Sequence, residues 1–353
     1  MTAHKILLMA IAAQVVAAGV ALVVIMVHAL HQRWWEQRFR FKAVTGARVI
    51  VEALDEGATR PDGLALLCSL PFRLQVRLFV DLAPNLSGLQ RERLTGLARD
   101  VGLVERAERQ CTSVFWWRRL QGARLLTILG GGESVLPSMF RDPRYEVRAQ
   151  VAEWAAEHPV GPVTESLVEM LGDAKTLCRF TVQDSLLRLG SAAVDPLTRR
   201  LLTGRRSLHE LTAALRVAGG LSDPRFLGPA LHLCSDERPE VRTLAVSVVG
   251  GLGGREGIEV LLARLSDPSA DVRAAAARSL GKLGHWPVAA PLAKLLRDQS
   301  WEVRREAALA LRALGTPGLL LLRRSLNDRD HFAADMARQV LDLPDTSVRS
   351  TSA

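Results

Sequence analysis

The segment that begins at Asp267, DPSADVRAAAARSLGKLG, decides the fold, because related copies of it recur along the chain. Four of these begin at Asp142 (DPRYEVRAQVAEWAAEH), Asp173 (DAKTLCRFTVQDSLLRLG), Asp236 (DERPEVRTLAVSVVGGLG) and Asp298 (DQSWEVRREAALALRALG). Weaker copies begin at positions 204 and 328, so that the starts are spaced by 30 to 32 residues. A fixed period of this length is typical of proteins in which each repeated unit packs on its neighbours.

Each copy is predicted to form a helix, a turn and a second helix. The opening Asp is expected to cap the first helix by accepting a backbone N–H. A glycine in a left-handed conformation is expected to end that helix, at Gly190, Gly253, Gly284 and Gly315. Second helices are expected over residues 258–266 and 288–297, with apolar residues on one face. One such pair cannot bury its own apolar side, so the sequence predicts an all-α solenoid.

The shared pattern D-x-x-x-x-V-R-x-x-A-x-x-(A/S)-L-x-x-L-G resembles the short HEAT-like repeats of phycobilisome lyase subunits. The resemblance covers residue 142 to the C-terminus, and Trp116-Trp117-Arg118-Arg119 looks like an opening repeat. It implies a structural ladder in which the repeated Asp and Arg side chains bond one another between units. The whole layout resembles bacterial membrane-anchored HEAT-repeat proteins, which implies a scaffold and not a catalyst.

Before the repeats, the chain carries an uncharged apolar run at residues 6–27. Its 22 residues are long enough for one helix to cross the roughly 30 Å hydrocarbon core. A cleaved signal peptide is the rival, but its apolar region would be about 7–15 residues. Lys5 precedes the run, and four basic residues follow it closely, Arg33, Arg38, Arg40 and Lys42. The positive-inside rule then predicts a single-pass inner-membrane protein with its N-terminus outside and its solenoid in the cytoplasm.

Four segments follow from these patterns. We expect a transmembrane anchor at 1–31, juxtamembrane and capping helices at 32–110, the HEAT-like solenoid at 111–344 and a disordered tail at 345–353. Helices in the second segment are expected to break at Pro61, Pro71 and Pro84.

No motif of catalysis or metal binding stands out. The four cysteines are far apart, only His209-Glu210 forms a His-Glu pair, and GxxxxGK[ST], GxGxxG and GxSxG are missing. We therefore predict that the protein is not an enzyme and uses no cofactor or metal. A lyase-like enzyme subunit or chaperone is the alternative, because of the family that the repeat resembles.

The net charge of +9 is carried mostly by arginine and is compatible with an anionic lipid surface, nucleic acid or an acidic protein, without choosing among them. Second helices usually line the inner groove of a solenoid, which is the common binding surface. Glu165 and Glu169 lie on early second helices. Basic residues follow on the later second helices, and we predict that they bind the partner: Arg199, Arg264, Lys294, Arg297, Arg323 and Arg324. We expect a groove that changes from acidic to basic and holds a protein partner, such as an envelope-associated enzyme. Nucleic acid is the other candidate, disfavoured by the few aromatic residues there.

Overall fold

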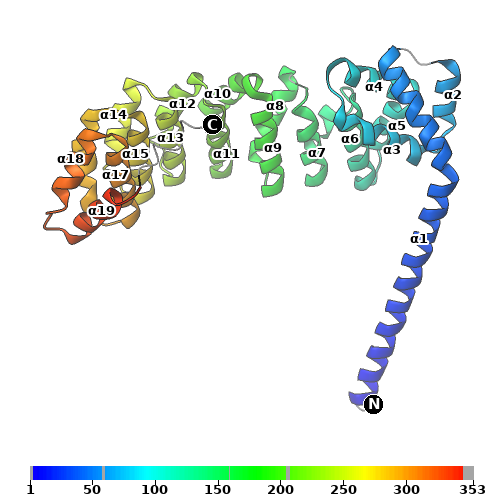
Figure 1. The fold of residues 1–353 in the computed structure, drawn as a ribbon, viewed down its shortest axis with the longest axis horizontal. Coiled ribbons are helices and arrows are strands. Elements are labelled where there is room, and N and C mark those ends of the chain that lie inside the picture. The colour runs from blue at the N-terminus through cyan, green and yellow to red at the C-terminus, as the bar shows by residue number, and fades with distance from the viewer. Residues whose placement is uncertain (1–2, 58–59, 159, 204–206, 345–353) are drawn as a thin grey trace. The chain divides into compact units, whose positions relative to one another are not determined.

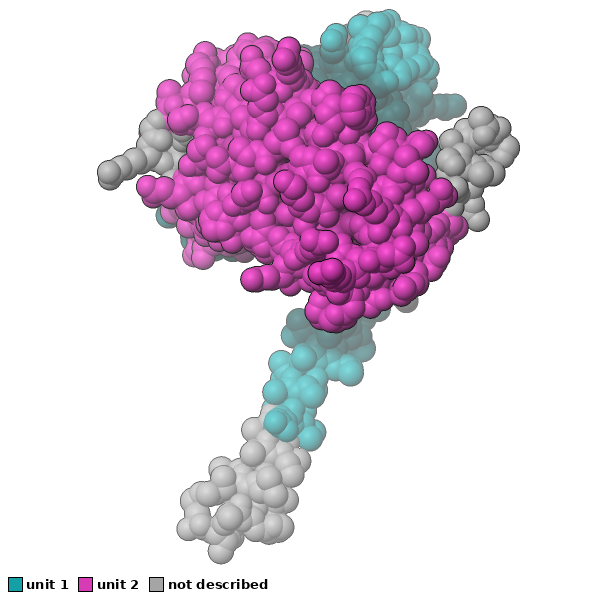
Figure 2. Space-filling view, turned by 90° about the vertical axis from the view of Figure 1, so that its left-hand side faces the viewer, with its two compact units in different colours: residues 1–133 teal, residues 134–353 magenta. Residues whose placement is uncertain are grey.

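The computed structural model describes residues 3–57, 60–158, 160–203 and 207–344, and these form helices and no strand. They form two compact units, residues 1–133 and 134–353 (Figure 2). The all-α, repeat-like prediction is confirmed. The predicted tail at 345–353 lies outside the described residues, as does the start of the weak repeat at 204–206.

The described residues of unit 1 form six α-helices and one short 3-10 helix. Their bounds are α1(Ala3–Glu56), α2(Pro61–Ser69), α3(Phe72–Leu82), η1(Ala83–Asn85), α4(Gly88–Asp100), α5(Leu103–Cys111) and α6(Trp116–Leu129). The breaks expected at the three prolines are present: Pro61 opens α2, Pro71 precedes α3 and Pro84 lies in η1. The unit extends past residue 110 and includes α6, which the sequence assigned to the solenoid.

The first helix joins two segments that the sequence treated separately. α1 runs without a break from the predicted anchor into the core of unit 1, where Ile50 and Leu54 are buried. The side chains of residues 3–13, 28, 31–33 and 35–40 lie outside the described part. Among the described residues, no single helix meets the length and hydropathy expected of a membrane span. Gln14–Val27 is a shorter apolar stretch, and α2 with α3 qualifies only as a pair bent by 117°.

Unit 2 consists of successive helical pairs. Its first helices are α7(Tyr145–Ala155), α9(Thr176–Leu189), α11(Leu208–Leu221), α13(Pro239–Leu252), α15(Ala270–Leu283), α17(Trp301–Ala313) and α19(His331–Leu341). Its second helices are α8(Gly161–Glu169), α10(Val194–Leu202), α12(Leu227–Leu233), α14(Arg255–Arg264), α16(Ala289–Lys294) and α18(Thr316–Ser325). In Figure 1, α8, α10, α12 and α14 follow the upper edge of the unit, with α7, α9, α11 and α13 beneath them. We call the surface of the second helices the second-helix face.

Short 3-10 helices complete the turns of unit 2. They are η2(Leu136–Arg141), η3(Met170–Gly172), η4(Gly190–Ala193), η5(Pro224–Phe226), η6(Trp286–Val288) and η7(Leu295–Arg297). The predicted second helices at 258–266 and 288–297 correspond to α14 and to α16 with η7.

The repeated valine and leucine of the pattern form the core. Val147, Val241, Val272 and Val303 have no exposed surface, and Cys178 is equally buried in the copy where it replaces valine. Burying one such side chain contributes about 1.5–3 kcal/mol relative to leaving it in water. Since successive first helices pack on one another, as α13, α15 and α17 do, the buried positions merge into one core.

The helix ends differ in detail from the prediction. Each opening Asp accepts a backbone N–H, as expected, but the donor is the residue two positions later. The N–H of Arg144 donates to Asp142, and the N–H of Ser269 donates to Asp267. The helix begins three residues after the Asp, so the carboxylate stabilises the turn before the helix and is not its N-cap. The four glycines predicted to end first helices all have positive φ, but only Gly284 is in the left-handed helical region.

Candidate partner-binding surface

An Asp–Arg ladder fixes the spacing of the second-helix face. The Arg148 Nε donates to Asp173 at 2.7 Å, and Arg242 and Arg273 each donate twice, at 2.8–2.9 Å, to Asp267 and Asp298. Each of these arginines also donates to the main-chain carbonyl of the Asp that opens its own repeat. One guanidinium therefore ties the turn of its own repeat to the turn of the next one. The predicted structural ladder is present at these steps.

The ladder is interrupted where the repeat is degenerate. No Asp stands at position 204, so Arg179 bonds the carbonyl of Asp173 and the hydroxyl of Thr176. Asp236 is instead held by Arg238 of its own turn. At the end of the array, Asp328 pairs with Arg297 and not with Arg304. Arg304 lies over the ring of Phe332, 4.9 Å from its centroid.

The ladder carboxylates are held in their ionised form. Burial opposes ionisation, but hydrogen bonds from Arg242 and from the backbone of Ser269 keep the pKa of Asp267 below its ordinary value. The pKa of Asp298 is lowered in the same way by Arg273. These groups are paired and largely enclosed, which makes them structural and leaves them unavailable to a ligand.

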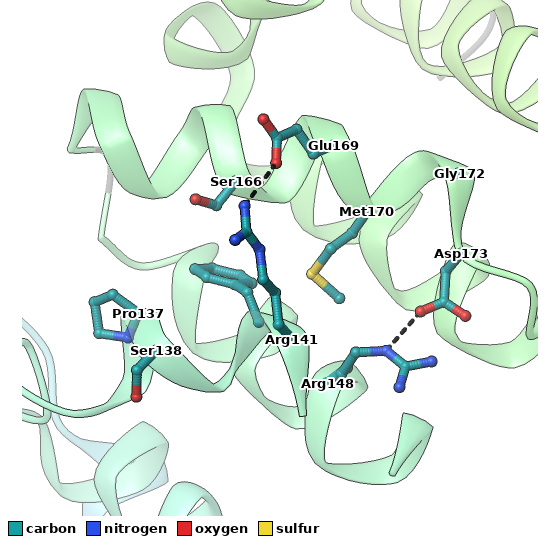
Figure 3. Close-up of a pocket in the computed structure, with 10 residues that line it drawn as sticks. Pro137, Ser138, Arg141, Arg148, Ser166, Glu169, Met170, Gly172 and Asp173 are labelled. Carbon is teal, nitrogen blue, oxygen red and sulfur yellow. Dashed lines mark hydrogen bonds and ion pairs between the residues drawn. The ribbon is translucent and has the colours of Figure 1, made fainter. Parts of the chain in front are cut away.

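A depression of about 520 Å³ opens beside the first ladder step. Figure 3 shows Arg141 reaching toward Glu169, with the pair Arg148–Asp173 at the other side and Met170 between them. A second hollow of about 160 Å³ follows at α10, lined by Glu165, Glu169 and Arg199 among others. Sequence reasoning missed Arg141, which lies at the end of η2, because a 3-10 turn carries no helical periodicity.

The structure separates the predicted partner-binding residues into two groups. Three are held by acidic neighbours: Arg199 by Glu165 at 2.7 Å, Arg264 by Asp267 at 3.6 Å and Arg297 by Asp328 at 2.8 Å. The other three, Lys294, Arg323 and Arg324, are exposed and make no ion pair with any residue that the structure describes. These three are therefore the residues whose charge is directed to solvent.

The expected acidic stretch at the early repeats is not found. Glu165 is neutralised by Arg199, and Glu169 lies 4.0 Å from Arg141. By contrast, α16, η7 and α18 carry Lys294, Arg297, Arg323 and Arg324 and contain no acidic residue. α16 packs beside α18, and we call the surface of α16, η7 and α18 the basic face. Arg297 on this face is paired with Asp328, so Lys294, Arg323 and Arg324 are the cations that it directs to solvent. The second-helix face thus changes from balanced to basic along the array.

The described residues contain no cluster of three or more His, Cys, Asp or Glu side chains with metal-binding geometry. Cys111, Cys178 and Cys234 are buried, and burial raises the pKa of each thiol to about 12. Such thiols stay protonated at neutral pH and are poor nucleophiles. Only Cys68 is exposed.

Comparison with known proteins finds a family match within the repeat array. Residues 258–342 match the family model for HEAT repeats. This match covers the end of the array that carries the basic face. Among curated protein sequences, none matches the chain.

Several solved structures match the chain at low sequence identity. Karyopherin Kap121p bound to Nup53p is 12% identical, with a TM-score of 0.55 over 79% of this chain and 37% of that chain. Kap121p bound to the extreme C-terminus of the phosphatase Cdc14p is 13% identical, with a TM-score of 0.55 over 82% and 38%. The CpcE–CpcF complex of phycocyanin lyase from Nostoc is 18% identical over 68% and 93%, with a TM-score of 0.31. Residues 258–342 therefore carry HEAT repeats, within an array of helical pairs whose fold resembles that of Kap121p.

Proposed function

We propose that this protein is a membrane-anchored scaffold whose basic face binds an acidic segment of a protein partner. The observation that carries the proposal is that α16, η7 and α18 hold no acidic residue, while Lys294, Arg323 and Arg324 on them make no ion pair with any described residue. A patch of one sign attracts an oppositely charged partner and speeds its association.

The fold supports an extended segment as the ligand. Helical-repeat arrays present long continuous surfaces made of equivalent helices, and such surfaces suit a partner that lies along them. Kap121p, which shares the fold, has been solved bound to Nup53p and bound to the extreme C-terminus of Cdc14p. The ladder supplies rigidity, since Arg242–Asp267 and Arg273–Asp298 tie the successive turns on which the basic face depends.

The membrane anchor is supported by the sequence of α1. Residues 6–27 carry no charged side chain, and Gln14–Val27, the part of that run whose side chains are described, is helical and apolar. The same helix continues into the core of unit 1, so an inserted N-terminal part would tether the folded domain through a continuous helix. With the basic flank on the C-terminal side, the partner would be met in the cytoplasm.

Binding to defined probes tests the proposal. The full-length chain in nanodiscs is titrated with a fluorescent Glu-rich peptide, a Lys-rich peptide of equal length and a DNA duplex. We expect the Glu-rich peptide to bind, and to bind more weakly as salt rises. The double reversal Arg323→Glu with Arg324→Glu should weaken binding roughly tenfold or more.

The matched control reverses Arg216 and Lys282, which are exposed on the first helices α11 and α15. It changes the net charge by the same amount and should leave binding of the acidic peptide within about twofold of wild type, since distant exposed charges are screened. Equal weakening by both reversals would show a non-specific charge effect and contradict the proposal. Tighter binding of the duplex than of the peptide would assign the basic face to nucleic acid instead.

A further inference from the structure

An aromatic turn in unit 1 stands out among the exposed apolar groups of the described residues. Between α5 and α6, Val114 is 91% exposed, and Phe115 and Trp117 are 48% and 52% exposed. The Phe115 and Trp117 rings stack with centroids 4.7 Å apart, and Trp116 meets Trp117 edge-on at 6.3 Å. We call residues 114–117 the aromatic tip. Its large side chains pack on one another and leave a broad apolar surface in water, which is costly unless something covers it.

Beside the aromatic tip lies a depression of about 450 Å³ with a basic lining. Arg106, Arg109 and Arg118 line it together with Gln110 and Ser113, and no acidic residue is among its lining residues. All three arginines are exposed. Guanidinium groups bind phosphate oxygens through two parallel N–H donors, and Gln110 and Ser113 add further polar groups. The depression has the chemistry of a site for a phosphate-bearing anion.

The contacts within unit 1 place the aromatic tip on the side from which α1 emerges. One stretch of α4 holds the C-terminal ends of two helices: Arg93 donates to the carbonyl of Leu54 in α1, and Thr95 donates to that of Leu129 in α6. The N-terminal end of α6, where the tip lies, is therefore remote from that stretch, as is the N-terminal part of α1.

A second set of contacts supports this placement. Leu70 packs on Gly46 of α1, and close to it Arg106 of α5 lies 4.3 Å from the centroid of the Phe72 ring. From Arg106, α5 continues away from α4 to the aromatic tip, and from Gly46, α1 continues away from α4 to its apolar stretch.

We infer that the aromatic tip and the arginines beside it form a second membrane contact, which inserts into the interface of a bilayer rich in anionic lipid. Tryptophan and phenylalanine partition into the headgroup region, where an apolar ring meets the acyl chains. Arginines at the same depth bind lipid phosphates and are attracted by the negative surface potential of an anionic leaflet. The inference rests in part on the proposed anchor, because α1 would bring the tip close to the surface.

A single label at the tip tests the inference. The full-length chain carries one reactive thiol, because Cys68 is exposed whereas burial raises the pKa of the other three to about 12. In a Cys68→Ser background, Val114→Cys is labelled with the environment-sensitive dye NBD. The matched control is Leu89→Cys, which is also exposed and apolar and lies in the same unit, at the start of α4.

Both labelled proteins are reconstituted into vesicles of neutral phosphatidylcholine with or without 30% phosphatidylglycerol, and flotation after carbonate washing reports the anchor separately. We expect the label at position 114 to shift to shorter wavelength and to be quenched by spin-labelled lipid in anionic vesicles, while the label at position 89 stays in water. Reversing Arg109 and Arg118 to Glu should lower the equilibrium constant for insertion about tenfold or more.

Two results would overturn the inference. In one, the protein floats with the vesicles, but the label at position 114 stays in water. In the other, the label inserts equally in neutral and anionic vesicles and is unaffected by the reversals, so that the arginines contribute nothing. Failure of the protein to float after carbonate washing would instead contradict the proposed anchor.

Discussion

At the scale of single residues, two adjacent glycines of α13 illustrate how closely the first helices pack. A methyl group on Gly250 would overlap the side chain of Ser279 in α15, whereas one on Gly251 would meet no atom within 4 Å. Gly250→Ala should therefore destabilise the protein by about 1–3 kcal/mol through overpacking. Gly251→Ala should be neutral or stabilise it by up to about 1 kcal/mol, because alanine favours the helix. Chemical denaturation of both variants checks the contrast, and equal effects would contradict the close approach.

The ladder carboxylates give a pH dependence with a definite sign. Because the pKa of Asp267 is lowered in the folded state, the stability that it contributes is fully present above the unfolded pKa near 4. That stability is lost as the pH falls from about 4 through the folded pKa. Asp267→Asn should cost about 2 kcal/mol at pH 7, by weakening the bonds that Arg242 donates. The difference should shrink toward pH 3, as thermal unfolding of variant and wild type across this range would show.

Sequence reasoning identified the ladder residues but not all of their partners. The period of the repeat identified Asp267 as one of the recurring Asp residues and Arg242 as one of the recurring Arg residues, and their pairing across 25 residues follows from stacking equivalent turns. The carboxylates that depart from this pattern are bound by a nearer arginine. Asp236, for example, is paired with Arg238 of its own turn. Likewise, the predicted binding residue Arg264 is drawn to Asp267, a contact that depends on the turn geometry and not on the repeat pattern.

At the scale of elements, the helical pairs depend on positions that the repeat keeps apolar. Val272 and Leu280 of α15 have no exposed surface. Replacing either with Asp should cost several kcal/mol, because it buries a charge without a partner, and should open the neighbouring helices to protease. Limited proteolysis and mass spectrometry would locate the new cuts between α13 and α17. Leu320→Asp is the matched control, since Leu320 of α18 is 59% exposed, and its cleavage pattern should stay that of wild type.

The sequence predicted most helices of unit 2 because the 30–32-residue period carries an Asp, a buried Val and a closing Gly in its best copies, those that begin at Asp236, Asp267 and Asp298. It predicted unit 1 less well, since those helices lack a repeat and only the prolines mark their ends. The aromatic tip was interpreted as the opening of a repeat, but α6 belongs to the first compact unit. Pattern alone cannot separate the two, because both places need an amphipathic helix after a turn.

At the scale of the whole molecule, the anchor is testable by charge insertion. Val20 and Val24 lie in the apolar stretch of α1, and an Asp near the middle of a span costs roughly 2.5–3.5 kcal/mol on insertion scales. The double variant Val20→Asp with Val24→Asp should leave the membrane pellet after carbonate extraction. The single variant Val44→Asp alters an exposed valine of the same helix beyond the apolar stretch and should stay in the pellet. Retention of the double variant would contradict a membrane-spanning α1.

The sequence predicted where basic residues occur along the array, but not which of them are paired with acidic residues. The net charge of +9 and the positions of Arg323 and Arg324 indicated a basic surface at the late repeats. The sequence could not show that Glu165 and Arg199, 34 residues apart, neutralise each other, because that pairing depends on how far α8 lies from α10.

The central claim is that an acidic protein segment binds the basic face, and capture from the native membrane tests it most directly. The full-length protein, the variant with Arg323→Glu and Arg324→Glu, and the control with Arg216 and Lys282 reversed are each crosslinked mildly, purified and examined by mass spectrometry. The account predicts one partner at near-equal amount with wild type and control, crosslinked through an acidic segment and lost from the Arg323/Arg324 variant. Recovery of the same partner with all three proteins, or of nucleic acid in its place, would contradict it.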